Sequence, residues 1–178
     1  MKTGCLYWIT GLAGAGKTTL ARRLFLDLKS HKENTVLLDG DVLRDIYRLP
    51  SGHYTEEQRY DVAMRHAKMC KLLTSQGIDV ICATISLFKD VRAWNRQQNK
   101  KYIEIFMDVS DQTLLRRNKN NLYIDEMTDN PLNQVVGKGV KAEYPKKPDI
   151  ILRNEGTTGI EPVFLKLKRF LDDGVNEK

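Results

Sequence analysis

The residues of this chain best suited to chemistry form a glycine-rich segment, Gly11–Thr18, with the sequence GLAGAGKT. The segment matches the pattern GxxxxGK[ST] at every fixed position, and it stands between an apolar run and a helix-like run. Glycines let backbone N–H groups converge on phosphate oxygens, and the N-terminus of a following helix adds partial positive charge. The pattern therefore predicts a loop that binds nucleotide phosphates, rather than an ordinary glycine-rich turn.

Each polar side chain of this loop has a predicted task. Lys17 is expected to reach the β- and γ-phosphates, and the hydroxyl of Thr18 is expected to ligate Mg²⁺. We therefore expect ATP and Mg²⁺ as cofactors. The residues predicted to bind the ATP phosphates are Gly11, Gly14, Ala15, Gly16, Lys17, Thr18 and Thr19.

Two carboxylates, Asp39 and Asp41, follow the apolar run Val36-Leu-Leu. In open α/β sheets, ligands bind at the carboxyl ends of the strands. A carboxylate at that edge can hold a Mg²⁺-bound water or accept the proton of an acceptor hydroxyl. We assign Asp41 as the catalytic base and Asp39 as a supporting residue and candidate metal ligand through water, beside Lys17. Alternatively, Asp41 only caps a helix expected over Val42–Tyr47.

The elements that position these residues alternate between short apolar runs and longer helical patterns, which is typical of a parallel α/β sheet. The runs are nearly continuous, as expected for strands covered on both faces, and lie at Cys5–Thr10, Thr35–Asp39, Ile78–Ile85, Tyr102–Val109 and Asp149–Leu152. Helical patterns lie at Lys17–Ser30, Thr55–Ser75, Phe88–Gln98, Asp111–Arg117 and Glu161–Leu171. Thr55, with Gln58 three residues later, predicts a capping box, and Gly77 predicts the end of that helix.

The segment 118–147 differs from the rest of the chain. It is polar, rich in asparagine, carries Gly137 and Gly139, and lacks periodicity. A segment of this length without secondary structure is usually functional, so we predict a lid. The fold class is α/β: a P-loop kinase with a parallel sheet of about five strands, helices on both faces, and a lid. Residues 1–178 are expected to form one domain.

The bulk composition limits the classes of function. The 178 residues are 41% hydrophobic and 29% charged, as in ordinary globular proteins. The N-terminus does not resemble a signal peptide and no apolar run has the length of a bilayer span, so we expect a cytoplasmic protein. The three cysteines form no CxxC pair, which indicates a reduced, structural role. The net charge of +6 fits anionic ligands and also nucleic acid.

Taken together, the motifs resemble those of the adenylylsulfate (APS) kinases in order and spacing over nearly the whole chain. The motifs are the P-loop, Asp39-Gly-Asp41-x-x-Arg44, Tyr54-Thr-Glu-Glu-Gln-Arg59, Ile85-Ser86-Leu-Phe-Lys, Ile103-Glu-Ile-Phe-Met-Asp108 and Leu122-Tyr123. The resemblance implies an ATP-dependent phosphotransferase with an alcohol group as acceptor. The acceptor group would be the ribose 3′-hydroxyl of a nucleotide with an unusual 5′ anhydride.

The resemblance also implies the acceptor-binding residues. By position, Arg44 and Arg59 match arginines that bind the charged groups of the acceptor, a task suited to the planar guanidinium fork. Tyr54 matches an aromatic residue that packs on the acceptor, and Ser86 lies in the loop that supports it. Without the family pattern, the two arginines would be interpreted as surface charge.

The chain departs from the family pattern on the acceptor side. Val42 replaces an asparagine of DGDNxR, Asp125 and Glu126 stand at basic lid positions, and Gly137 stands where the family has a base-stacking phenylalanine. These departures resemble the branch that phosphorylates cytidine diphosphoramidate in capsule modification. The acceptor is thus expected to be cytidine diphosphoramidate or, as in sulfate assimilation, APS.

Two other interpretations remain open at this level. One is a small-metabolite kinase of the shikimate or gluconate type. The other is a nucleic-acid-binding P-loop protein, which is disfavoured because no basic run with interleaved aromatics is present. We expect a small-molecule nucleotide as partner, with no nucleic acid and no membrane, and a homodimer as one assembly open to the chain.

Overall fold

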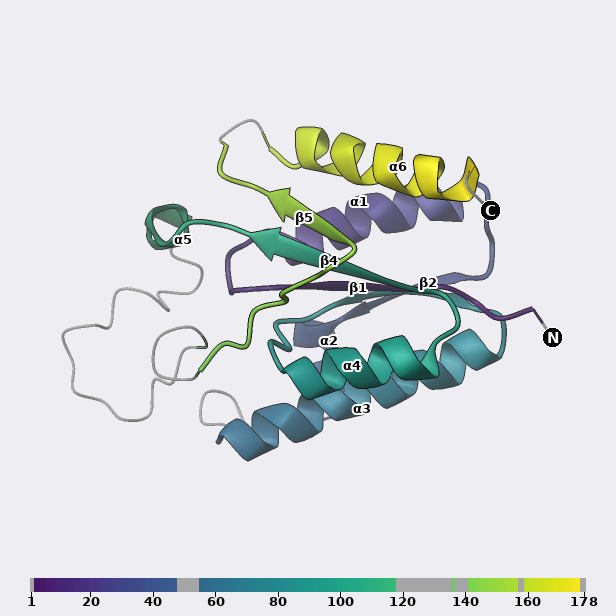
Figure 1. Ribbon diagram of the computed structural model, residues 1–178, viewed down its shortest axis with the longest axis horizontal. Coiled ribbons are helices and arrows are strands. Elements are labelled where there is room, and N and C mark those ends of the chain that lie inside the picture. Colours follow the sequence, from purple (N-terminus) through teal and green to yellow (C-terminus); the bar gives the residue numbers. More distant parts are fainter. Residues whose placement is uncertain (1, 48–54, 118–135, 137–140, 157–158, 177–178) are drawn as a thin grey trace.

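A five-stranded parallel sheet, ordered β2-β3-β1-β4-β5, forms the centre of the computed structural model (Figure 1). The structure describes residues 2–47, 55–117, 136, 141–156 and 159–176. The strands are β1 (Leu6–Gly11), β2 (Thr35–Asp39), β3 (Asp79–Ala83), β4 (Tyr102–Asp108) and β5 (Ile150–Arg153). The helices are α1 (Lys17–Lys29), α2 (Gly40–Ile46), α3 (Glu56–Ser75), α4 (Lys89–Gln98), α5 (Asp111–Arg117) and α6 (Glu161–Asn176).

Helices cover both faces of the sheet, with α1 and α6 on one side and α3 and α4 on the other (Figure 1). Successive residues of β1 serve the two cores. Tyr7 and Ile9 belong to one cluster, and Leu6 and Trp8 belong to the other. Because both faces are buried, every residue of β1 is buried, which explains its nearly continuous apolar sequence. The predicted fold class is confirmed.

The local signals located most elements to within one or two residues. Thr35–Asp39 and Asp111–Arg117 have the predicted bounds, while α6 continues past Leu171 to Asn176. Thr55 and Gln58 form the predicted capping box at the start of α3. Gly77 follows the end of that helix at φ 84°, a left-handed conformation in which glycine is favoured.

The helix predicted over Val42–Tyr47 begins earlier, at Gly40, because Asp39 is its N-cap. The Oδ1 atom of Asp39 accepts a hydrogen bond from the backbone N–H of Asp41 at 2.9 Å. The alternative that Asp41 acts as the cap is therefore wrong. The parallel arrangement gathers β2, α2 and the P-loop at the carboxyl edge of the sheet.

One finding concerns passage through a lipid bilayer. Among the described residues, no helix combines the length and the apolar character needed to span a membrane.

Helix α2 ends against a buried histidine of α3. The rings of Tyr47 and His66 stack with centroids 5.8 Å apart and an interplanar angle of 27°. His66 is 2% exposed, and neither ring nitrogen has a hydrogen-bond partner in the described part of the chain. Burial, and secondly the positive charge of Arg44, lowers the pKa of His66 to about 4. The imidazole is therefore neutral at pH 7 and supports α2 as an apolar ring.

This burial predicts a specific loss of stability in acid. Because the pKa of His66 is lower in the folded chain than in the unfolded one, its contribution is complete above about pH 6.5 and is lost as the pH falls through about 4. From the shift of that pKa to about 4, the loss should approach about 3 kcal/mol. Urea unfolding of the wild type and of His66→Leu, each at pH 7 and pH 4, measures the difference.

His31 is exposed and provides the matched control, since His31→Leu should keep the pH dependence of the wild type. If the wild type and His66→Leu lose the same free energy of unfolding between the two pH values, the buried histidine has no part in acid sensitivity.

Candidate active site

The P-loop passes very close to neighbouring atoms at two of its glycines. A Cβ atom on Gly11 would lie 2.6 Å from the carbonyl oxygen of Met107, and Gly11 has φ 147°. A Cβ atom on Gly16 would lie 2.5 Å from Nδ2 of Asn154, and Gly16 has φ 98°. Side chains at these positions would push the loop away from β4 and β5, so the motif glycines follow from tertiary packing as well as from ligand binding.

The N-terminus of α1 points its backbone donors at the loop. Gly16 is the N-cap and contributes no side-chain hydrogen bond to the first turn. The N–H groups there lack the usual capping side chain and are suited to anion binding, which the positive helix end favours. Lys17 donates from Nζ to the carbonyl oxygen of Leu12 at 2.7 Å, so its ammonium group lies over the loop. Thr18 is partly buried in the first turn.

Asp39 and Asp41 have different surroundings although they are two residues apart. Asp39 uses Oδ1 to cap α2, while its Oδ2 atom is buried and accepts no hydrogen bond from the described residues. The carboxylate of Asp41 is 52% exposed and forms an ion pair with Arg44. The two side chains therefore differ in burial and in hydrogen bonding.

The unpartnered oxygen of Asp39 fits a hydrated Mg²⁺ ion. A buried carboxylate oxygen without a hydrogen bond needs a ligand to offset its desolvation. Within the described part of the chain, no group of three or more His, Cys, Asp or Glu could bind a metal ion by itself. Mg²⁺ usually keeps several waters and binds through one or two protein oxygens together with substrate phosphates. The set of Thr18 and Asp39 suits this mode of binding.

Ser86 lies in a strained and tightly held loop after β3. Its φ angle is 26°, unusual for a residue other than glycine, and its buried Oγ atom has no hydrogen-bond partner among the described residues. The hydroxyl of Thr10 donates to the carbonyl oxygen of Ile85. Strain of this kind persists only where the surrounding contacts enforce it, and it is common at ligand sites.

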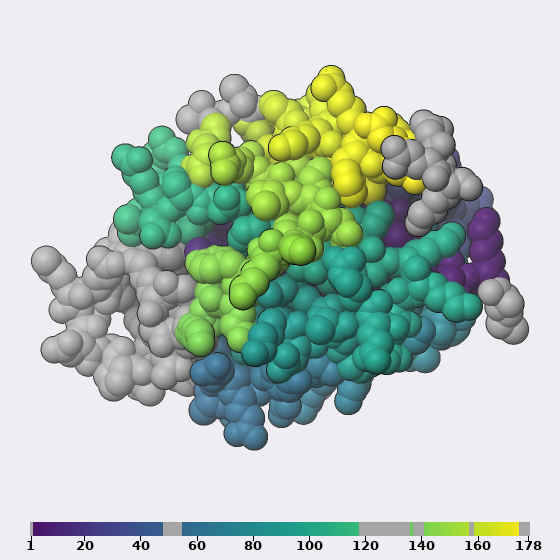
Figure 2. All heavy atoms as spheres, viewed as in Figure 1, coloured from purple at the N-terminus to yellow at the C-terminus, as the bar shows by residue number. Residues whose placement is uncertain are grey.

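Glu143 holds the other side of this loop. Its backbone N–H donates to the carbonyl oxygen of Leu87 at 2.9 Å, and its Oε2 accepts from the backbone N–H of Lys89 at 2.8 Å. Segment 141–149 is thereby fastened to the Ser86 loop, and it runs over the surface between α4 and α6 (Figure 2).

The structure describes some of the remaining predicted site residues and leaves others outside the described ranges. Arg44 lies on α2, and Arg59 is partly buried in the first turn of α3, whose N-terminal end lies on the side of the sheet where the strands end (Figure 1). Tyr54 lies outside the described residues. So does most of the predicted lid, residues 118–135 and 137–140, with Asp125, Glu126 and Gly137.

Two residues at the P-loop were not foreseen from the sequence. Asn154 is buried directly after β5, and its Nδ2 donates to the carbonyl oxygen of Ala15 at 3.0 Å. Arg117 donates to the carbonyl oxygens of Gly14 at 3.2 Å and of Asn154 at 2.7 Å. Asn154 could have been predicted as a site residue, because it is polar and directly follows a strand at the carboxyl edge of the sheet.

The strand order, the P-loop and the carboxylates of β2 and α2 together define a P-loop kinase. The family model described as adenylylsulphate kinase matches residues 3–153. The chain therefore belongs to the APS kinase family, whose members are ATP-dependent phosphotransferases with a hydroxyl acceptor.

Individual relatives agree with this assignment. The chain is 36% identical over 158 residues to a cytidine diphosphoramidate kinase of Campylobacter jejuni, covering 88% of this chain and 89% of the relative. It is 33% identical over 156 residues to an adenylyl-sulfate kinase of Burkholderia ambifaria, covering 86% and 85%. In the bifunctional enzyme NodQ of Rhizobium tropici, at 34% identity, the match spans 27% of the relative.

A solved structure shows the same architecture. The APS kinase CysC of Mycobacterium tuberculosis, in complex with AMPPNP and APS, superposes with a TM-score of 0.80 at 25% identity, covering 97% of this chain and 99% of that one. These similarities support the nucleotide kinase over the shikimate- or gluconate-type alternative.

Replacing Lys17 by Ala should abolish phosphoryl transfer and leave the fold intact. The variant removes the positive charge expected at the β- and γ-phosphates, and its kcat should fall at least about 100-fold, as when one preorganised donor is lost. ADP release measured beside a circular dichroism melt tests this. Near-normal turnover by folded Lys17→Ala would contradict the assignment of the loop.

Substitutions of Asp41 and Asp39 should affect different kinetic quantities. Asp41→Asn keeps the size of the side chain but cannot take a proton, so kcat should fall by about 10²–10⁴. Asp39→Asn should instead raise the Mg²⁺ concentration needed for half-maximal rate, because its orphan oxygen becomes part of a neutral amide. Rates over a Mg²⁺ titration measure both effects, and an unimpaired Asp41→Asn would remove Asp41 from the chemistry.

Proposed function

We propose that the chain transfers the γ-phosphoryl group of ATP to the ribose 3′-hydroxyl of cytidine diphosphoramidate, as a step in capsule modification. The observation that carries this proposal is the contrast between the two sides of the site. The P-loop is complete, whereas the acceptor side departs from the APS kinase pattern. Val42, in place of an asparagine, is 52% exposed on α2 beside Asp41. The similarity to the Campylobacter jejuni kinase supports the same choice.

The proposed reaction uses the described residues as follows. Asp41 accepts the proton of the 3′-hydroxyl while the oxygen of that group bonds to the γ-phosphorus and the bond to the leaving ADP breaks. Lys17 and the N–H groups at the start of α1 stabilise the charge on the phosphates. Thr18 and, through a water, Asp39 would hold Mg²⁺, which would supply positive charge beside the phosphates.

The arginines hold the anionic 5′ end of the acceptor. Arg44 is 40% exposed in its ion pair with Asp41, and exposed pairs of this kind contribute at most about 1 kcal/mol. The acceptor can therefore take Arg44 from Asp41 at little cost, which would leave the carboxylate ready to receive a proton. Arg59 and the buried hydroxyl of Ser86 complete the proposed contacts, with Tyr54 packing on the acceptor.

A cytoplasmic location, a single domain and a homodimer remain predictions.

The decisive experiment compares acceptors on one enzyme preparation. Cytidine diphosphoramidate, APS, shikimate and gluconate are each supplied with ATP and Mg²⁺, and kcat/KM is obtained from ADP release. Cytidine diphosphoramidate should give the highest value, and phosphorus NMR should locate the new phosphate at the 3′ position. A clear preference for APS would identify a sulfate-assimilation kinase, and a preference for shikimate or gluconate would reject a nucleotide acceptor.

A further inference from the structure

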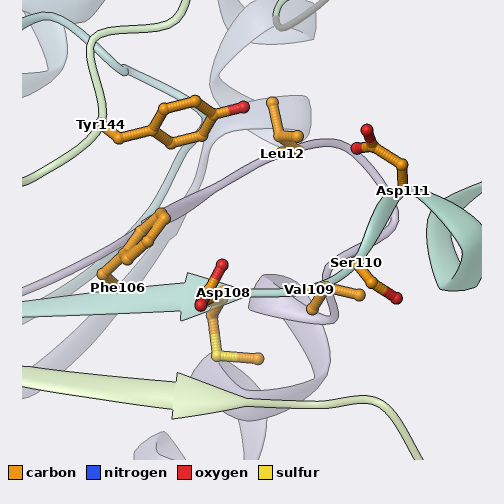
Figure 3. A pocket seen from close by; sticks show the side chains of 8 residues that line it. Leu12, Phe106, Asp108, Val109, Ser110, Asp111 and Tyr144 are labelled. Carbon is orange, nitrogen blue, oxygen red and sulfur yellow. The ribbon is translucent and has the colours of Figure 1, made fainter.

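A cavity of about 280 Å³ adjoins the P-loop at the carboxyl ends of β1 and β4 (Figure 3). Phe106 and Asp108, two residues apart on β4, point toward the side on which Tyr144 lies (Figure 3). Leu12 belongs both to the P-loop and to the wall of the cavity. A ligand in this cavity therefore lies beside the phosphate-binding loop. The full lining is Leu12, Phe106, Met107, Asp108, Val109, Ser110, Asp111 and Tyr144.

The walls suit a flat ring. The rings of Phe106 and Tyr144 have centroids 5.9 Å apart and are tilted by 58°, so they form a corner of two aromatic faces. Tyr144 is 47% exposed, which leaves much of its ring uncovered by the protein. Aromatic faces stack on nucleobases in a manner that tolerates different sequences. The volume is sufficient for a base and is small for a whole nucleotide.

The carboxylates of Asp108 and Asp111 supply hydrogen-bond acceptors to the cavity. The pKa of Tyr144 is raised by burial and then by the negative charges of Asp111 and Asp108, which agrees with their positions around the same cavity. Ser110 is engaged elsewhere, since its N–H and its hydroxyl both donate to Glu155, at 2.6 Å and 2.8 Å. Asp108 has an ion-pair contact of 3.7 Å with Arg153, which is 79% exposed and holds it weakly. A base with N–H donors complements these carboxylates.

One wall of the cavity is attached to the loop of Ser86, a predicted acceptor residue. Tyr144 directly follows Glu143, which binds the loop of Ser86 through the carbonyl oxygen of Leu87 and the N–H of Lys89. Asn154 and Arg117 contact other residues of the P-loop, through the carbonyl oxygens of Ala15 and Gly14. We propose that the cavity binds the base of the acceptor nucleotide and selects bases that carry an exocyclic amino group. This inference rests on the proposed function and assigns a binding site within it.

The base preference can be measured with matched pairs of acceptors. Cytidine and uridine nucleotides with the same 5′ group differ by an amino group in place of a carbonyl oxygen. The wild type should favour the cytidine form in kcat/KM by at least about 10-fold, because a carbonyl oxygen facing a carboxylate leaves both groups without a donor. In Asp108→Asn and Asp111→Asn, the ratio of kcat/KM for the cytidine acceptor to that for the uridine acceptor should be smaller. An amide at either position can donate a hydrogen bond to the carbonyl oxygen of the uridine base. Asp172→Asn, on the exposed face of α6, is the matched control and should have the same ratio as the wild type.

Substitutions of Tyr144 test whether its ring stacks on the base of the acceptor. Tyr144→Ala should raise the KM for the cytidine acceptor by roughly 5- to 150-fold, the range that base–aromatic stacking supplies. Tyr144→Phe keeps the ring and should restore most of the affinity. ATP binding, measured by calorimetry without acceptor, should be the same in all three proteins.

The outcomes separate this inference from the proposed function. If cytidine and uridine nucleotides are phosphorylated equally well, the cavity does not select the base, although the kinase assignment stands. If Tyr144→Ala weakens ATP binding and leaves the acceptor KM unchanged, the cavity serves the donor and the inference is wrong. If no nucleotide acts as acceptor, the proposed function fails and the inference fails with it.

Discussion

The close approach of the P-loop backbone to its neighbours is the constraint on which the rest of the site depends. Gly11 passes against the carbonyl of Met107, and Gly16 passes against the side chain of Asn154, at distances that leave no room for a Cβ atom. The loop is therefore held by β4 and by the segment after β5, as well as by its own turn. A phosphate cradle built in this way is preorganised, so its N–H groups need little rearrangement when a nucleotide binds.

The same edge of the sheet separates two carboxylate roles within three residues. Capping α2 occupies one oxygen of Asp39, while the other is buried with no hydrogen-bond partner among the residues that the structure describes, a costly arrangement without a ligand. Asp41, two residues later in the first turn of α2, is exposed beside Arg44. Burial thus distinguishes the two carboxylates although they have the same side chain, and this difference supports the proposal that Asp39 serves a metal-bound water and Asp41 the proton transfer.

The loop of Ser86 and the contact between α2 and α3 show several features that cost stability. Ser86 has a strained backbone and a buried hydroxyl without a partner in the described chain, and both ring nitrogens of His66 are likewise unpartnered beneath α2. Such features persist where other contacts over-determine them, here the bonds of Thr10 and Glu143 to the loop of Ser86.

The sequence by itself determined the features whose causes lie within a few residues along the chain. These are the P-loop, strand β2, the capping box of α3 and the class of fold, because each depends on local hydrogen bonding or on the period of apolar residues. The sequence predicted the start of α2 two residues too late, at Val42 in place of Gly40. The choice between Asp39 and Asp41 as the cap depended on backbone geometry. Only the tertiary structure decided that Asn154 holds Ala15, 139 residues away, that Glu143 holds Lys89, 54 residues away, and that Tyr144 meets Phe106. These contacts follow from the strand order, which brings distant segments to one edge of the sheet and leaves no periodic trace in the residues themselves.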